Sequence, residues 1–572
     1  MSTKKRNVIA ILLFVAMLIA TLTSLMSCKK TEEPPVEPVE PTEPKEMTFL
    51  KVNGGAVKDA SGEEIYLRGV NVGGLFVTEH WMTGFAYTTP SNDYKSLTQT
   101  FIDRFGEEKT KELWAEYRAN WWTEVDFQNC ADMGMNVLRL PFTYMNVDFD
   151  AITSYEHAGE NYDFSDLDAF VSKAAEYGMY TILDLHGAYG SHNGQDHSGE
   201  IIGNVSDVHF YYDKQLMDLT VKLWSELSKH FKDNPYVAGY DILNEPGEKA
   251  GLTSERHWDF YDKVYKAIRQ NDDEHIVIFE SCWDGKDLPQ PDVYGWENCM
   301  YSFHHYTSNT KTDEANILAH NLSWNEKIEG VTKQNFGVPI QMGEFTSYTS
   351  VSKWDYTLDL LNRLNWHWTS WTYKVWGNMP WGIVNIRGSA ADKVDAVNDE
   401  YEDIVNKFKI LRTDGASAQK YTFSGTNVTL ESVFKRYCNA PSQTERLPEG
   451  NYLFETDEGY LAFNGVQNGR TVVNISDNYY AGIMLNLTYH PSNDGSVFLT
   501  VNSLYMCALD GSSYFTLKSL SSPTKSNERF FPVKYEDGWT FVSYATCKYL
   551  TVTNGLITAS ATTIEKATVF YF

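Results

Sequence analysis

The chain has 572 residues, of which 42% are hydrophobic and 14% aromatic, and its formal net charge is −28. This length exceeds one ordinary domain but accommodates a barrel of about 250 residues or more together with a further module. The negative charge argues against nucleic acid and anionic lipid as partners, because both are bound through Lys and Arg, and it favours a neutral substrate.

The first 27 residues have the layout of a signal peptide. Basic residues at positions 4–6 precede the apolar run Val8–Ala20, which is too short to span a bilayer. The sequence LMSC that follows, residues 25–28, resembles a bacterial lipobox, in which Cys28 is lipidated and becomes the first mature residue. We therefore expect a lipoprotein signal peptide at residues 1–27 and a lipid anchor on Cys28.

Residues 28–46 are expected to form a tether. The KKTEE sequence at residues 29–33 resembles the lysine-plus-acidic export signal of surface lipoproteins in the Bacteroidetes, although it is also readable as the charged start of a linker. It predicts an outer-membrane protein exposed at the cell surface, with a periplasm-facing position as the alternative. Repeated Pro and Glu in residues 32–46 favour an extended, semi-rigid spacer.

Six further cysteines are spread along the chain without CxxC or Cys/His metal spacing. Buried free thiols are the expected state, and disulfides remain open. His186, His192 and His197 lie close together in the sequence, but they lack the spacing of a zinc site, and their loop is expected to form a wall of a substrate site. The sequence predicts no metal and no cofactor.

Strand-like and helix-like segments alternate from residue 47 to about residue 440, which predicts an α/β fold of the (β/α)8 TIM-barrel type. A hairpin at residues 50–69 is expected to cap the bottom of the barrel. Amphipathic segments at residues 167–178 and 215–231 are expected to be helices. The predicted core strands are residues 65–74, 136–142, 180–187, 237–246, 275–281, 300–306, 338–345 and 368–374.

Polar side chains gather at the carboxyl ends of these predicted strands. In a TIM barrel those ends form one rim, where active sites are built. Packing alone does not account for so many polar residues in equivalent positions, so the pattern predicts a functional site. The residues are Arg139, His186, Asn244, Glu245, His304, Tyr306 and Glu344.

Residues 447–572 differ in style from the rest of the chain. Short β-like runs alternate with Gly, Asn, Asp and Ser turns, and a faint repeat of about forty residues predicts an all-β domain, as a β-trefoil. The segments KYLTV (548–552) and FTLKS (515–519) resemble fascin-like trefoils. Carbohydrate binding is one interpretation of this domain, and a packing or spacer module is the other.

Glu245 and Glu344 are candidates for a pair of catalytic carboxyl groups. Each ends a predicted strand, and the closed barrel would place them across one cleft. Glycoside hydrolysis needs two carboxyl groups on either side of one bond, in different ionisation states. Their separation is not readable from the sequence, so retention and inversion of configuration both remain open on spacing alone.

Four motifs in this order resemble glycoside hydrolase family 5 of the retaining 4/7 superfamily, over roughly residues 64–374. They are LRLP (138–141), NEP (244–246), HHY (304–306) and MGEF (342–345). The resemblance implies that Glu245 is the acid/base and Glu344 the nucleophile.

The same resemblance implies substrate-binding roles for the neighbouring residues. Asn244 would bind the 2-hydroxyl of the sugar, and Arg139 and Tyr306 would hold Glu344 ionised and aligned. His186 and His304 would orient sugar hydroxyls and carboxylates. The remaining implied role is that of Trp371, a stacking floor under the sugar.

Three longer stretches resemble the exo-β-1,3-glucanase branch of this family, namely residues 68–84, 114–142 and 183–200. This likeness implies that Glu79 binds a terminal glucose. Residues 370–382 depart from the branch, and the C-terminal domain is foreign to it. The leading hypothesis is therefore a retaining β-glycosidase that hydrolyses β-glucan, with β-1,3-glucan favoured and exo action possible.

Two alternatives stay open. One is an endo-acting β-1,4-glucanase or mannanase of the same family, since the fold and the carboxylates are shared. The other is a non-catalytic surface glycan-binding lipoprotein, which the presence of Glu245, Glu344, Arg139 and Asn244 together argues against. Glu245 could instead cap a helix, and the histidines could be ordinary core residues. These interpretations do not explain why so many polar residues occur together at the ends of the predicted strands.

Overall fold

A computed structural model describes most of the chain after residue 46. The described ranges are 47–87, 93–204, 207–247, 254–281, 284–307, 310–443, 445–467, 470–508, 515–519 and 526–572. The predicted signal peptide, Cys28 and the tether lie outside them. Within these ranges the structure contains no helix long and apolar enough to cross a membrane.

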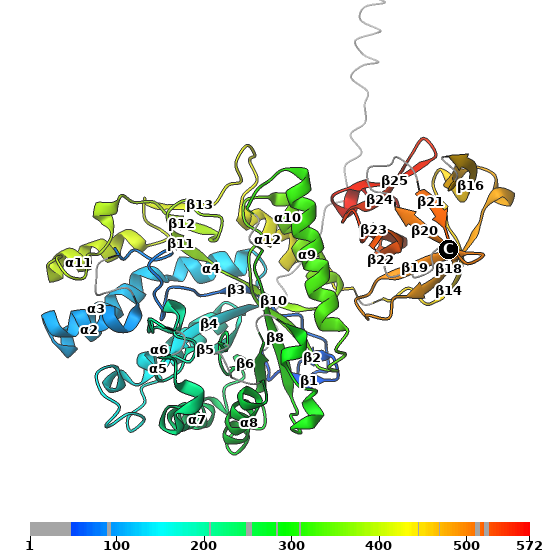
Figure 1. Cartoon of the computed structure of the whole chain (residues 1–572). Helices are drawn as coiled ribbons and strands as arrows, with labels where there is room; N and C mark the ends of the chain where they lie inside the picture. The colour runs from blue at the N-terminus through cyan, green and yellow to red at the C-terminus, as the bar shows by residue number, and fades with distance from the viewer. Residues whose placement is uncertain are drawn as a thin grey trace, which may run out of the picture. The chain divides into compact units, whose positions relative to one another are not determined.

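Eight parallel strands close into a barrel, which confirms the predicted (β/α)8 architecture (Figure 1). Around the barrel the order is β10, β3, β4, β5, β6, β7, β8 and β9. Most of these strands are buried along their whole length, as strands covered by helices must be. Their bounds are β3 Arg68–Asn71, β4 Val137–Thr143, β5 Tyr180–Gly187, β6 Val237–Asp241, β7 Ile276–Glu280, β8 Cys299–His305, β9 Ile340–Phe345 and β10 His367–Ser370.

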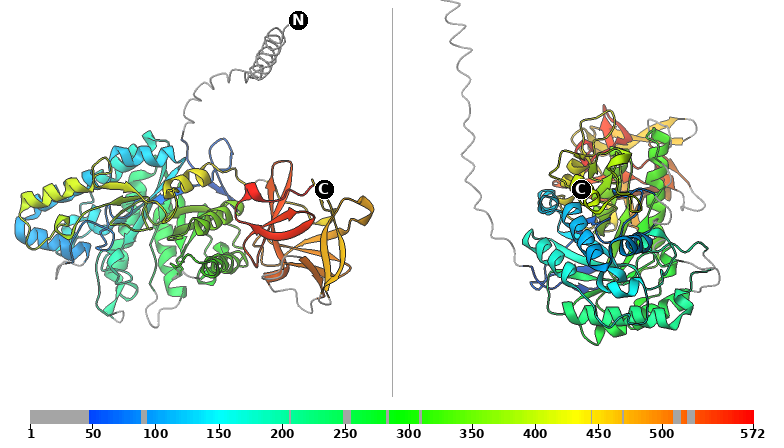
Figure 2. Two further views of the ribbon diagram at one scale, coloured as in Figure 1. Left: turned by 90° about the horizontal axis from the view of Figure 1, so that it is seen from above. Right: turned by 90° about the vertical axis from the view of Figure 1, so that its left-hand side faces the viewer.

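Helices surround the barrel in every view (Figure 2). The two helices predicted from amphipathic segments are α6 (Ser165–Glu176) and α7 (Lys214–Phe231). The others are α2 Tyr94–Phe105, α3 Glu107–Trp121, α4 Glu124–Asp132, α5 Tyr144–Val147, α8 Ser254–Arg269, α9 Glu314–Thr332, α10 Val351–Arg363, α11 Tyr401–Phe408 and α12 Leu430–Cys438.

Three predicted strands are markedly shorter than expected, and the first of them, β3, occupies only residues 68–71 of the predicted 65–74. β6 ends at Asp241, so that Asn244 and Glu245 lie in the loop that follows, where Pro246 has no N–H to continue a ladder. β10 ends at Ser370, and the chain then enters a separate small sheet. This sheet is formed by β11 (Lys374–Trp376), β12 (Val384–Ile386) and β13 (Ala418–Lys420).

The predicted hairpin is present at the amino-terminal ends of the barrel strands. β1 (Lys51–Asn53) and β2 (Ala56–Lys58) pair antiparallel. Their apolar side chains join one buried cluster with Val137 and Met300, which stand near the starts of β4 and β8. The bottom of the barrel is therefore closed, and a site must lie at the opposite end.

The C-terminal region is an all-β body with its own hydrophobic core. The structure assigns twelve strands to one antiparallel sheet there, and only short 3-10 turns interrupt them in the described residues. The strands are β14 Gly450–Leu453, β15 Glu455–Thr456, β16 Gly459–Gln467, β17 Arg470–Ser476, β18 Met484–Tyr489, β19 Val497–Val501, β20 Leu504–Ala508, β21 Phe515–Lys518, β22 Arg529–Tyr535, β23 Gly538–Ser543, β24 Tyr549–Thr553 and β25 Leu556–Ala561.

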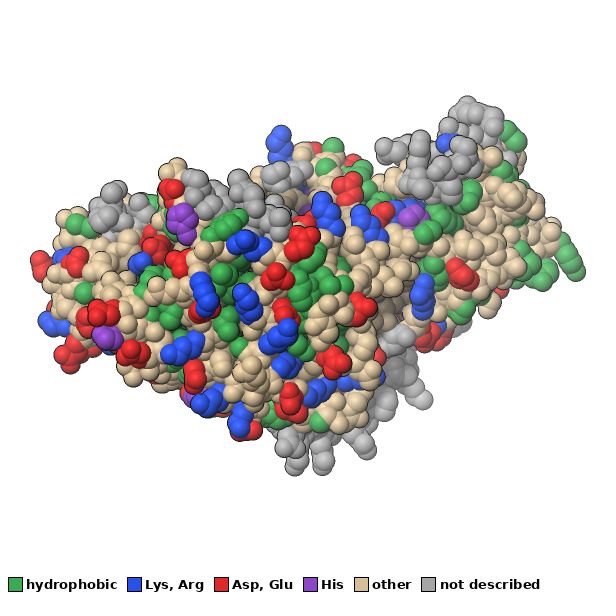
Figure 3. Space-filling model, turned by 60° about the horizontal axis from the view of Figure 1, so that its bottom comes forward, with side chains coloured by type: hydrophobic (Ala, Val, Ile, Leu, Met, Phe, Trp, Pro, Cys, Tyr) green, Lys and Arg blue, Asp and Glu red, His purple; other side chains and the backbone are tan. Residues whose placement is uncertain are grey.

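Charged side chains of both signs lie on the surface, and the described cysteines are free. Acidic and basic side chains are interspersed on the face shown in Figure 3, without a large area of one sign. The five cysteines within the described ranges are free, and four of them are buried. These findings confirm free thiols for the cysteines that the structure describes.

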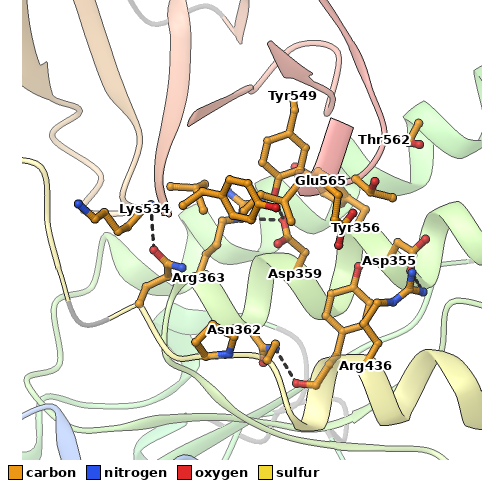
Figure 4. Close-up of a pocket in the computed structure, with 18 of the residues that line it drawn as sticks. Asp355, Tyr356, Asp359, Asn362, Arg363, Arg436, Lys534, Tyr549, Thr562 and Glu565 are labelled. Carbon is orange, nitrogen blue, oxygen red and sulfur yellow. Dashed lines mark hydrogen bonds and ion pairs between the residues drawn. The ribbon is translucent and has the colours of Figure 1, made fainter. Parts of the chain in front are cut away.

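Polar contacts join α10 to the C-terminal strands around a cavity of about 290 Å³ (Figure 4). The hydroxyl of Tyr549 on β24 donates to Asp359 at 2.8 Å, and Arg363 Nε donates to the same carboxylate oxygen at 3.0 Å. The Arg363 guanidinium also lies over the Phe531 ring, 5.0 Å from its centroid. The barrel and the C-terminal sheet therefore share a polar seam.

Arg529 is the buried charge of this seam. It is 3% exposed and pairs with Asp494 within the C-terminal sheet and, at 2.8 Å, with Glu329 on α9. Removing it would leave the buried Asp494 carboxylate unpaired, which costs far more than losing a solvent-exposed pair.

We expect Arg529→Met to lower the free energy of unfolding by about 3–5 kcal/mol, because it leaves a buried charge uncompensated. Urea denaturation of the mature chain measures this. Lys548→Met is the matched control, since it removes a 2.7 Å ion pair to Glu314 that is largely exposed, and we expect little change. Equal losses in both variants would contradict the assignment.

Candidate active site

The guanidinium of Arg139 lies at the centre of the barrel's carboxyl end. It is fully buried, and it contacts carboxylates from four other strands. The distances are 3.1 Å to Asp184, 2.9 Å to Asp241, 3.2 Å to Glu280 and 2.9 Å to Glu344. Arg139 also donates to the side-chain oxygens of Asn71 and Asn244, each at 2.9 Å. One cation thus organises polar groups from five strands and from the loop after β6.

Four carboxylates around one guanidinium cannot all be ionised without cost. Burial raises the pKa of Asp184 and of Asp241 well above the ordinary value, in spite of the opposing charge of Arg139. Both therefore tend to hold a proton in the folded chain. The same burial does not discharge Arg139, because the surrounding carboxylates raise the pKa of its guanidinium further.

Glu344 is the penultimate residue of β9, and two hydrogen-bond donors hold its carboxylate. Arg139 contacts one of its oxygens at 2.9 Å, and the Tyr306 hydroxyl donates to the other at 2.8 Å. His304 Nδ1 lies 3.5 Å from that second oxygen. A register shift between Phe303 and His304 aligns His304 with Glu344 across the β8–β9 pair, as bulges beside active sites often do.

The Tyr306 hydroxyl is a stable hydrogen-bond donor to Glu344. Burial, together with the negative charges of Glu344 and Glu245, raises the pKa of Tyr306 well above its ordinary value. The phenol therefore stays protonated and donates a hydrogen bond to the carboxylate. The Glu344 side chain is 6% exposed, so it reaches the mouth of the barrel with its charge matched on both oxygens.

Glu245 lies in the loop after β6 with a φ of 38°, a conformation that non-glycine residues rarely adopt. Its backbone N–H donates to Glu280, which holds the loop in this form. One side-chain oxygen is 2.8 Å from His304 Nδ1, and the other is 3.3 Å from His197 Nε2. The residue therefore presents its carboxyl group between two imidazoles.

Glu245 and Glu344 meet at His304. One carboxylate oxygen from each, and one nitrogen of His304, all lie within 4.8 Å of one another. Carboxyl groups about 5–5.5 Å apart suit direct attack by one of them, whereas about 6.5–9.5 Å leaves room for a water molecule. The nearest oxygens of the two carboxylates are thus within 4.8 Å of each other.

His304 carries a positive charge in this site. Burial alone would lower its pKa, but Glu280, Glu344 and the contact with Glu245 outweigh burial and raise the pKa well above the ordinary value. Burial would conversely raise the pKa of Glu245, but the hydrogen bond and charge of His304 lower it to about 2. The two groups are one coupled pair that shares protons.

His186, Asn244 and Trp371 lie beside this pair. His186 Nδ1 is 2.7 Å from Asp184 Oδ2, and Asn244 Nδ2 lies 3.4 Å from His186 Nε2. Burial lowers the pKa of His186 to about 3, so the ring is neutral. Trp371 stacks on that ring at 5.4 Å with an interplanar angle of 8°. The structure therefore brings all three predicted residues into the site.

Glu79 lies near the two carboxylates, next to a group of aromatic rings. It accepts from Trp81 Nε1 at 2.7 Å, and the Trp81 ring is 5.1 Å from the Trp381 ring. Trp381 also contacts Tyr306, with 5.6 Å between ring centroids. Burial and nearby carboxylates raise the pKa of Glu79 well above its ordinary value. Every predicted residue of the barrel site is thus within one connected group.

The sequence reading missed several members of the site. Glu280 is the most important, and it occupies the end of β7, the same position that identified the other candidates. Asp184 lies two residues before His186, in the interior of β5. An acidic residue at that position does not by itself indicate a functional site in the sequence. Trp381 lies in a long loop without a motif, whereas His197 lies in the loop that the sequence predicts as a wall of the substrate site, without a role of its own. The remaining unpredicted members are Asn71, Asp241 and Trp81.

Two groups among the described residues have the spacing to hold a cation. They are Glu79 with Asp196 and His197, and Glu245 with His304 and Glu344. In the second group the three side chains already contact one another, and in the first Glu79 is engaged by Trp81. We assign no metal to either.

Asp241→Asn is expected to make stability less dependent on pH. The raised pKa of Asp241 means that the folded chain holds a proton that the unfolded chain releases near pH 4, so its contribution is lost as pH rises. Asparagine removes this dependence, and the variant should gain stability relative to wild type between pH 5 and pH 8 in urea denaturation. Asp403→Asn, at an exposed helix position, should show no such trend.

Residues 102–377 match the family model Cellulase (glycosyl hydrolase family 5). A beta-xylosidase from Phanerodontia chrysosporium is 31% identical over 266 residues, 46% of this chain and 52% of that protein. Glucan 1,3-beta-glucosidase from Pichia angusta is 28% identical over 256 residues, 43% of this chain and 56% of that protein. The protein of the same name from Candida oleophila is 28% identical over 247 residues, 41% of this chain and 54% of that protein.

The chain spans about half the length of the curated relatives it matches. The matched region covers most of the barrel, including both carboxylates and Arg139. Residues 102–377 are therefore similar to glycosyl hydrolase family 5, and part of the chain is similar to proteins named as glycosidases.

Proposed function

We propose that this protein is a retaining β-glycosidase that hydrolyses β-glucan. The observation that carries the proposal is the placement of Glu245 and Glu344, with one oxygen of each within 4.8 Å of the other. This spacing suits a double displacement, in which one carboxylate attacks the sugar directly. A water molecule between the two groups would need a wider gap.

In the proposed reaction Glu344 is the nucleophile and Glu245 the acid/base. A Glu344 oxygen bonds to the anomeric carbon while Glu245 gives its proton to the departing glycosidic oxygen. Glu245 then takes a proton from water, which attacks the same carbon and releases Glu344. The neighbours support these roles, because Glu344 is paired with Arg139, whereas Glu245 is 2.8 Å from Nδ1 of the titratable His304.

The remaining residues would bind and orient the sugar. The side-chain amide of Asn244 is fixed by Arg139 and His186, which prepares it to bind a hydroxyl beside the bond being broken. Trp371 offers an aromatic ring backed by His186. Glu79 would bind the terminal sugar, at the rim formed with Trp81.

Glu344→Gln and Glu245→Gln are each expected to lower kcat/KM by about 10³-fold or more, because each removes one half of the chemistry. Hydrolysis of an oligosaccharide followed by NMR measures this and also shows which anomer is released first. The β-anomer is expected for wild type. Glu402→Gln, at an exposed position on α11, is the control. First release of the α-anomer would contradict the retaining mechanism.

For the substrate, β-1,3-glucan is favoured over β-1,4-glucan and mannan. Two of the relatives above are named glucan 1,3-beta-glucosidase, although another is named beta-xylosidase. The buried Glu79 at one side of the mouth is in keeping with recognition of a chain end, and so with exo action.

We expect laminarin to yield glucose as the first product, and a mixture of longer oligosaccharides would indicate endo action instead. Chromatography of products from laminarin, cellulose, mannan and xylan makes the comparison. Glu79→Gln should weaken release of glucose from chain ends, whereas Glu402→Gln should not. Faster hydrolysis of cellulose, mannan or xylan than of laminarin would overturn the preferred substrate.

We further propose that residues 447–572 form a β-trefoil that binds carbohydrate. In support, the twelve strands assigned there fall into three consecutive groups of four, β14–β17, β18–β21 and β22–β25. Tyr479 and Tyr480 are 58% and 93% exposed on this domain, and exposed rings are suited to stack on sugars. A packing role remains the alternative to binding.

We also propose a lipid anchor on Cys28 and a position at the surface of the outer membrane, with the periplasm as the alternative. The support is the signal-like sequence before Cys28 and the Pro/Glu-rich residues after it. In that position the tether would hold the barrel away from the membrane, within reach of an external polysaccharide.

A further inference from the structure

Glu280 is a buried carboxylate that connects both proposed catalytic residues without facing the sugar. It is 0% exposed and ends β7. One oxygen lies 2.7 Å from His304 Nε2 and 3.2 Å from Arg139 Nη2, and the other accepts the backbone N–H of Glu245. Glu280 therefore acts on the reaction through other groups.

His304 is the link between Glu280 and Glu245. Its Nδ1 lies 2.8 Å from a Glu245 oxygen, and its Nε2 lies 2.7 Å from Glu280. The second contact is a close ion pair, and the charge and hydrogen bond of Glu280 are among the causes that raise the pKa of His304. A bare nitrogen lone pair at that distance from a carboxylate oxygen would be repelled, so Nε2 must carry the proton.

Two of the groups that contact Glu280 are hydrogen-bond donors. They are Arg139 and the Glu245 N–H, and neither can accept a proton from Glu280. Asp184 and Asp241 contact the same guanidinium, and burial raises the pKa of each well above its ordinary value. Glu344 faces His304 from β9, 3.5 Å from Nδ1.

With Nε2 protonated, the contact between Nδ1 and Glu245 holds one more proton. That proton sits either on Nδ1, beside a Glu245 carboxylate, or on Glu245, beside a neutral ring. Both arrangements contain the same number of protons, so the pair changes from one to the other without exchange with solvent. The low pKa of Glu245 describes the first arrangement, and proton donation needs the second.

We propose that Glu280 is a positioning residue that fixes one proton on Nε2 of His304, so that the proton between Nδ1 and Glu245 is the one delivered to the leaving group. The negative charge of Glu280 also raises the affinity of the His304–Glu245 pair for that proton. In the balanced step, the proton leaves Glu245 for the glycosidic oxygen as the bond to the anomeric carbon breaks and the Glu344 bond forms. This inference rests on the proposed glycosidase function.

Glu280→Gln tests the inference through the leaving group. Acid catalysis matters for a sugar leaving group and little for 2,4-dinitrophenol, so we expect kcat/KM to fall about 10²-fold on laminaribiose and less than about tenfold on 2,4-dinitrophenyl β-glucoside. The basic limb of the pH profile on laminaribiose should move to lower pH, because the pair has lost a neighbouring negative charge. Equal losses on both substrates with an unmoved limb would overturn the proposal.

Two further variants separate this role from a merely structural one. Glu280→Asp keeps the charge, and it should restore part of the laminaribiose activity and the position of the basic limb. Asp241→Asn removes a buried carboxylate that pairs with Arg139, whereas the carboxylates paired with His304 are Glu245, Glu280 and Glu344. This variant should leave the ratio between the two substrates unchanged. A changed ratio in Asp241→Asn, or no recovery in Glu280→Asp, would count against Glu280.

Neutron diffraction of the wild-type protein tests the same point without a variant, and it decides the matter even where Glu280→Gln does not fold. We expect a proton on Nε2 of His304, and an unprotonated Nε2 would overturn the proposal. The outcome is distinct from failure of the proposed function. A wild-type protein that cleaves neither substrate would refute the glycosidase assignment, while the proton on Nε2 would still report on Glu280.

Discussion

The site depends on one buried ion cluster, the guanidinium of Arg139 among the carboxylates of Asp184, Asp241, Glu280 and Glu344. A guanidinium without these partners would be too costly to bury, and so would the carboxylates without it. Its planar fork contacts groups on several strands at once, which no single ammonium group does. The cluster therefore fixes the relative positions of the strand ends that carry the proposed catalytic groups.

The cluster also makes the two proposed catalytic carboxylates different. Glu344 is bound by Arg139 and by the Tyr306 hydroxyl, both of which favour a charged oxygen. The side chain of Glu245 is more exposed than that of Glu344, and it contacts His304 and His197. Glu344 is thus paired with a permanent cation, whereas Glu245 is paired with a group that can gain or lose a proton. A nucleophile and a proton donor need such different surroundings.

Around this charged centre the mouth is lined with rings. Trp371 stacks on His186, and Trp81, Trp381 and Tyr306 form a partly buried aromatic group next to it. Such surfaces bind the apolar faces of sugars while the polar residues below select hydroxyl groups. The C-terminal sheet adds a separate core joined to the barrel by the polar seam around Arg529 and Arg363.

The sequence alone determined the barrel, because eight apolar runs separated by amphipathic segments have few other ways to bury their surface. It also determined that Glu245 and Glu344 lie at one rim, since the carboxyl ends of parallel strands meet there. Only the tertiary structure decided how near the two carboxylates lie and which neighbouring groups influence the ionisation of each. Those facts depend on barrel closure, on the register shift before His304 and on the left-handed φ of Glu245. Glu280 became visible for the same reason: its contacts come from residues far away in the chain, and no local pattern encodes them.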